Sequence, residues 1–112
     1  MAWHRPLPPV LEAASRRCRA ICAETLAVYG GEDGDTTERE FAGTLLTVIA
    51  AIDAALDAEP ERRQRSLGAA AQVARGAAEQ IRRYGLDERI LRCAAACEEL
   101  DRRYAGARAD DR

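Results

Sequence analysis

The chain has 112 residues, the size of one domain, with 17 basic and 19 acidic side chains and a net charge of −2. Lysine and asparagine are absent, which indicates a GC-rich bacterial coding sequence. The charges are interspersed, without the basic cluster of a nucleic-acid-binding protein. No apolar run reaches the roughly 20 residues that cross a bilayer, and the N-terminus lacks a signal peptide's apolar segment. We therefore expect a cytoplasmic protein that binds neither nucleic acid nor membrane.

The first half of the chain predicts a tail and two helices. Residues 1–9 form a proline-rich tail, and a helix begins after Pro9 because proline suits the first helical turn. Glycines and acidic residues at 30–35 end this helix, and Pro60 closes a second one. Apolar or small residues recur at helical spacing in both, at Leu11, Ala14, Cys18, Ile21, Thr25 and Val28, and at Phe41, Leu45, Val48, Ile52 and Leu56.

The second half predicts two more helices, one over residues 61–84 and one that opens at Asp87. Their apolar positions are Leu67, Ala70, Ala74, Ala77, Ile81 and Tyr84, and Leu86, Ile90, Cys93, Cys97, Leu100 and Tyr104. Residues 106–112 are polar and predict a disordered tail. The fold expected over residues 10–105 is all-α, an antiparallel up-down-up-down four-helix bundle, because each helix must bury its apolar stripe.

All four cysteines fall in two pairs with the same four-residue spacing, one pair on the first helix and one on the last. These helices are antiparallel neighbours in the expected bundle, with Tyr29 level with Asp87. At a rise of 1.5 Å per residue, Cys22 lies about 10 Å from that level and Cys93 about 9 Å. The other two cysteines lie about 16 and 15 Å from it on the same rise. The sequence therefore predicts that the four thiols face one another in two pairs, Cys22 with Cys93 and Cys18 with Cys97.

Three interpretations of the thiols follow. They can be small apolar core residues, since free cysteine is among the most buried residue types. They can form disulfides between the two helices, whereas residues four apart on one helix are too distant for the bond. They can also bind a soft metal ion, copper(I), zinc or an iron–sulfur cluster. Zinc and iron–sulfur sites usually take cysteines from loops, whereas copper(I) accepts two or three thiolates and needs less convergence.

The segments CRAIC at 18–22, CAAACEEL at 93–100 and YGLDERILRC at 84–93 resemble the cysteine-rich four-helix-bundle copper storage proteins. In that family, cysteine pairs of this spacing point into the core and hold copper(I). The family has cysteines on all its helices, whereas the second and third helices here have none. The resemblance therefore implies a small copper(I) site in place of a high-capacity store. Its ligands would be Cys18, Cys22, Cys93 and Cys97.

The remaining residues do not indicate an enzyme. The single histidine, His4, lies in the N-terminal tail, so no serine–histidine or cysteine–histidine pair is expected. If Met1 is removed, His4 becomes the third residue and can complete a square-planar copper(II) or nickel(II) site. The alternative to a copper(I) protein is a metal-free interaction module. It would form homo-oligomers through the alanine-rich third helix, with any further protein partner unspecified.

Overall fold

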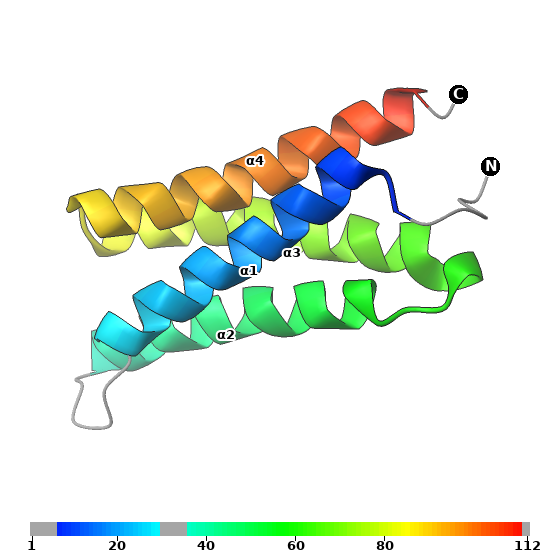
Figure 1. The fold of residues 1–112 in the computed structure, drawn as a ribbon. Helices are drawn as coiled ribbons and strands as arrows, with labels where there is room; N and C mark the ends of the chain where they lie inside the picture. The colour runs from blue at the N-terminus through cyan, green and yellow to red at the C-terminus, as the bar shows by residue number, and fades with distance from the viewer. Residues whose placement is uncertain (1–6, 30–35, 111–112) are drawn as a thin grey trace.

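The computed structural model describes residues 7–29 and 36–110, and the regular structure in these ranges is entirely helical. The four helices are α1 (Pro9–Tyr29), α2 (Thr36–Leu56), α3 (Pro60–Tyr84) and α4 (Glu88–Asp110). They lie side by side in an elongated bundle (Figure 1). The predicted all-α four-helix fold is confirmed, and His4 lies outside the described residues.

The helices close into a ring, in which each packs against the next and α1 packs against α4. The contacts between α1 and α4 run in opposite directions along the two helices. Cys22 contacts Cys93. One turn earlier on α1, Cys18 contacts Cys97, which lies one turn later on α4. This is the pattern of antiparallel neighbours. In Figure 1 the colour gradient likewise reverses direction from each helix to the next.

The core is built from the predicted stripes and is rich in small residues. Its largest fully buried aliphatic side chains are Leu11, Leu45, Ile52, Leu67, Ile81 and Leu100. From α3, five alanines between positions 70 and 78 are buried among them. Gly68 shows how close the packing is, since a Cβ there would lie 2.6 Å from the Tyr104 hydroxyl oxygen. The alanine-rich face of α3 is therefore used inside the bundle.

Asp87 determines where α4 begins. Its Oδ1 accepts a hydrogen bond of 2.9 Å from the backbone N–H of Ile90, as expected of an N-cap residue. In the connection between α2 and α3, the backbone of Glu59 is extended and Pro60 occupies the first turn of α3. The predicted start of α4 at Asp87 is confirmed, whereas α2 ends at Leu56, before the predicted limit, and Pro60 is the first residue of α3.

Three sequence expectations differ from the structure. Val28 is 54% exposed because the predicted stripe repeats every 3.5 residues, so it drifts off the core face of a helix with 3.6 residues per turn. Leu86 is 77% exposed because it precedes α4 and does not share its core face. Helix α4 also continues through Gly106 to Asp110, where a disordered tail was expected, because a single glycine weakens a helix without ending it.

Candidate metal centre

The four cysteines lie at the interface between α1 and α4. Cys18 and Cys22 are one turn apart on α1, and Cys93 and Cys97 are one turn apart on α4. All four side chains have an exposed fraction of 0%, and all four are free thiols. The sequence prediction that the two pairs meet is confirmed, because each cysteine of α1 contacts a cysteine of α4.

The sulfur atoms form a compact cluster. The Sγ of Cys18 lies 3.7 Å from that of Cys97, and the Sγ of Cys22 lies 3.7 Å from that of Cys93. These are the two pairs that the helical rise predicts. A diagonal contact of 4.0 Å joins Cys22 to Cys97. The sulfurs of Cys18, Cys22 and Cys97 all lie within 4.8 Å of one another, and Cys93 adjoins this group through Cys22.

The spacing of the sulfurs suits a metal ion. For metal–sulfur bonds of about 2.3 Å, as in zinc sites, three sulfurs around one ion lie about 4.0 Å apart in a plane and about 3.8 Å apart in a tetrahedron. The triple of Cys18, Cys22 and Cys97 therefore needs only small side-chain movements to surround an ion. A disulfide would require the sulfurs to approach to about 2.05 Å, which the free thiols have not done.

Three of the buried thiols, those of Cys18, Cys93 and Cys97, have raised pKa values. The pKa of Cys93 is raised to about 12, chiefly by its hydrogen bond with Cys22 and further by burial. The pKa of Cys18 is raised by its interaction with Cys22, and that of Cys97 by its hydrogen bond with Cys18, with burial adding to both. Since the thiolate is the metal ligand, binding must release protons, and affinity must fall as the pH falls.

The donor set of the cluster is purely sulfur. Within residues 7–29 and 36–110, no histidine, aspartate or glutamate joins the group of thiols that can hold an ion. Thr25, one turn beyond Cys22, is a polar side chain next to the cluster, and its interaction with Cys93 offsets a small part of the rise in that residue's pKa. Its hydroxyl also donates a hydrogen bond of 2.7 Å to the Ile21 carbonyl oxygen. Thr25 was predicted only as a core position, although its three-residue spacing from Cys22 placed it on the thiol face.

None of the helices in the described ranges is long and apolar enough to cross a membrane. Comparison of the chain with protein-family models, curated proteins and solved structures gave no match. The interpretation of the cluster therefore depends on its own geometry. That geometry identifies a buried group of cysteines, on the first and last helices of a four-helix bundle, that can bind a metal ion.

Proposed function

We propose that this protein binds copper(I) in the cytoplasm through Cys18, Cys22, Cys93 and Cys97, without catalysing a reaction. One observation carries the proposal, the group of three fully buried sulfurs that lie within 4.8 Å of one another. Soft thiolates select copper(I), zinc or iron–sulfur clusters over hard ions, and the absence of oxygen and nitrogen donors from this group favours the softest of these.

Coordination number separates copper(I) from zinc. A structural zinc site takes four ligands in a tetrahedron, whereas copper(I) is satisfied by two or three thiolates. Here three sulfurs share one centre, and Cys93 lies beside Cys22 at 3.7 Å, outside that triple. This arrangement supplies a three-sulfur site directly and leaves Cys93 to bridge to a second copper(I). Burial also shields the ion from water and oxidants.

Self-association of a metal-free bundle has less support. That alternative depended on a small-residue surface of α3, and five of the six alanines of that helix are buried inside the bundle, whereas Ala69 is exposed. Gly68 likewise packs beneath Tyr104. Nothing in these contacts requires a second copy of the chain.

The test is an anaerobic titration of the fully reduced protein with copper(I) in the presence of a chromophoric competitor. We expect one or two equivalents to be withheld from the competitor. The variant Cys93→Ala/Cys97→Ala should bind copper(I) much more weakly, because only the two thiols of α1 remain. Alanine is the replacement of choice, since Ala94 and Ala96 are already buried beside these positions. Undiminished binding in the double variant, or none in the wild type, would refute the proposal.

Zinc provides the comparison in the same experiment. If the protein prefers copper(I), zinc added in excess should not displace it. Replacement by zinc, with four thiolates per ion, would identify a structural zinc site instead.

A further inference from the structure

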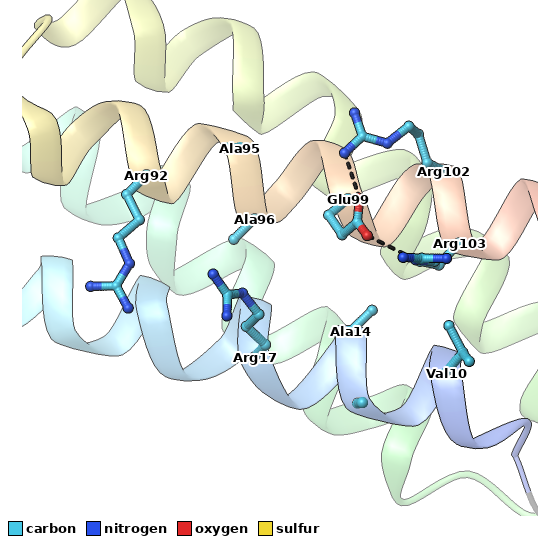
Figure 2. A pocket seen from close by; sticks show the side chains of 10 residues that line it. Val10, Ala14, Arg17, Arg92, Ala95, Ala96, Glu99, Arg102 and Arg103 are labelled. Carbon is cyan, nitrogen blue, oxygen red and sulfur yellow. Dashed lines mark hydrogen bonds and ion pairs between the residues drawn. The ribbon is translucent and has the colours of Figure 1, made fainter.

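A groove of about 570 Å³ lies along the seam between α1 and α4 (Figure 2). This volume falls within the range of small-molecule binding sites. The short side chains of Ala14 and Ala96 line the groove, and both are almost fully buried. The rest of its lining includes four arginines and a single glutamate.

The negative charge of this glutamate, Glu99, is already balanced by two arginines. Glu99 accepts hydrogen bonds from Arg102 and, at 2.8 Å, from Arg103, and these contacts lower its pKa, so that it stays ionised. Both arginines are exposed at one end of the groove, where Figure 2 shows them on either side of the carboxylate. This end of the groove therefore has two guanidinium groups for one carboxylate.

The other end is lined by two guanidinium groups that form no ion pair with a carboxylate of the described residues. Arg17 extends from α1 and Arg92 from α4, and Figure 2 shows both reaching into the space between the helices. Neither has an ion-pair or hydrogen-bond partner within the described residues, whereas Arg16 and Arg19, beside Arg17 in the chain, pair with Glu12 and Asp53. Both side chains are exposed, so water screens the repulsion between them, and an anion held between them would turn it into attraction to a shared partner.

We propose that this groove binds a small anion with two or more phosphate or carboxylate groups, held between Arg17 and Arg92. Guanidinium groups present paired N–H donors that match the oxygens of phosphate and carboxylate. The alanines allow the ligand to approach the helix surface, and Arg102 and Arg103 can receive its second charged group. The site is separate from the thiols and does not require metal, so it stands or falls independently of copper(I) binding.

The position of the groove also predicts a link to the thiols. Arg17 immediately precedes Cys18 and Arg92 immediately precedes Cys93, so the ligand would bridge the outer side of the interface that buries the sulfurs. A ligand that joins α1 to α4 opposes their separation, and reagents reach these fully buried thiols through such separation. Ligand binding should therefore slow thiol alkylation.

Isothermal titration calorimetry at low ionic strength tests the site, with inorganic pyrophosphate and citrate as the probes. We expect binding of at least one probe. The variant Arg17→Gln/Arg92→Gln should weaken it by about tenfold or more, since both charged hydrogen-bonding partners are lost. The matched control is Arg65→Gln/Arg75→Gln, which removes the same charge from exposed positions on α3 outside the groove and should change affinity little.

Each outcome is informative. Binding of pyrophosphate alone identifies a phosphate ligand, and binding of citrate alone identifies a carboxylate ligand. No heat with either probe would overturn the proposal. Equal weakening in the two double variants would also overturn it, because the binding would then reflect overall charge and not the groove.

Discussion

The hydroxyl of Tyr29, the last residue of α1, donates a hydrogen bond to the carboxylate of Asp87, the residue that caps α4. This contact joins the end of one helix to the start of the other. It agrees with the register in which the helices pass each other, in which Cys22 lies opposite Cys93 about two turns away. The same contact raises the pKa of Tyr29 and lowers that of Asp87, so the phenol and the carboxylate keep the protonation states that the hydrogen bond needs.

The Tyr29–Asp87 contact predicts an ordered set of stabilities. Tyr29→Phe should lower the denaturant midpoint slightly, because the ring keeps its edge contacts with Phe41 and Tyr84 and loses only the hydroxyl. Asp87→Ala should lower it further, because it also removes the cap on Ile90. Adding Tyr29→Phe to Asp87→Ala should have no further effect. Fully additive losses in urea unfolding would show that the two side chains do not interact.

Single cysteine variants should affect copper(I) binding unequally. Cys97→Ala should abolish the first equivalent, because Cys97 contacts the sulfurs of both Cys18 and Cys22. Cys93→Ala should retain that equivalent, because the triple stays intact and only the neighbour of Cys22 is lost. Competition titrations of the two variants provide the measurement. Equal losses would indicate that all four thiolates hold a single ion.

The ion pair between Arg82 and Glu98 predicts a pH-dependent contribution to stability. Arg82 donates two hydrogen bonds, of 2.5 and 2.7 Å, to the Glu98 carboxylate and lowers its pKa from 4.5. A carboxylate with a lowered folded pKa adds stability that is complete above its unfolded pKa and is lost as the pH falls through the folded value. Glu98→Gln should thus cost less than about 1 kcal/mol at pH 7, because the pair is partly exposed, and nothing near pH 2.

Chemical denaturation at several pH values checks this prediction. The control is Glu79→Gln, which changes an exposed carboxylate on α3 with no ion-pair partner within the described ranges. That variant should have nearly the same stability as the wild type at every pH. A Glu98→Gln deficit that persists in acid would mean that the residue acts through packing and not through its charge.

Two glycines of α3 should respond differently to replacement by alanine. A Cβ at Gly76 would meet nothing within 4 Å, so Gly76→Ala should stabilise the protein by about 0.5–1 kcal/mol through helix propensity. A Cβ at Gly68 would lie 2.6 Å from the hydroxyl oxygen of Tyr104, and this clash should cancel or reverse the gain. Adding Tyr104→Phe to Gly68→Ala deletes that oxygen and should recover part of the stability lost to the clash. Thermal unfolding of these three variants and the wild type provides the measurement, and equal stabilisation by the two alanines would contradict the close packing.

Much of the site was predictable because a helix has a fixed rise. The level of each cysteine along the bundle followed from counting residues from Tyr29 and Asp87, and the pairing of Cys18 with Cys97 follows from that count. The lateral positions of the sulfurs were not predictable, because a small rotation of α1 about its axis changes which three thiols share a centre. The groove was not predictable either, because its lining depends on how α1 and α4 are packed. Arg17 and Arg92 are 75 positions apart, and only the packed helices bring them to one seam.

The thiols that meet are separated by 71 and 79 residues in the chain, because they belong to the first and last of the four helices. A ribosome therefore releases Cys18 and Cys22 long before their partners exist. Until α4 emerges and docks, these two thiols lack the α4 side chains that cover them in the folded protein. The cluster can assemble only when the ring of four helices is complete, so a filled metal site would mark a chain in which α4 has docked against α1.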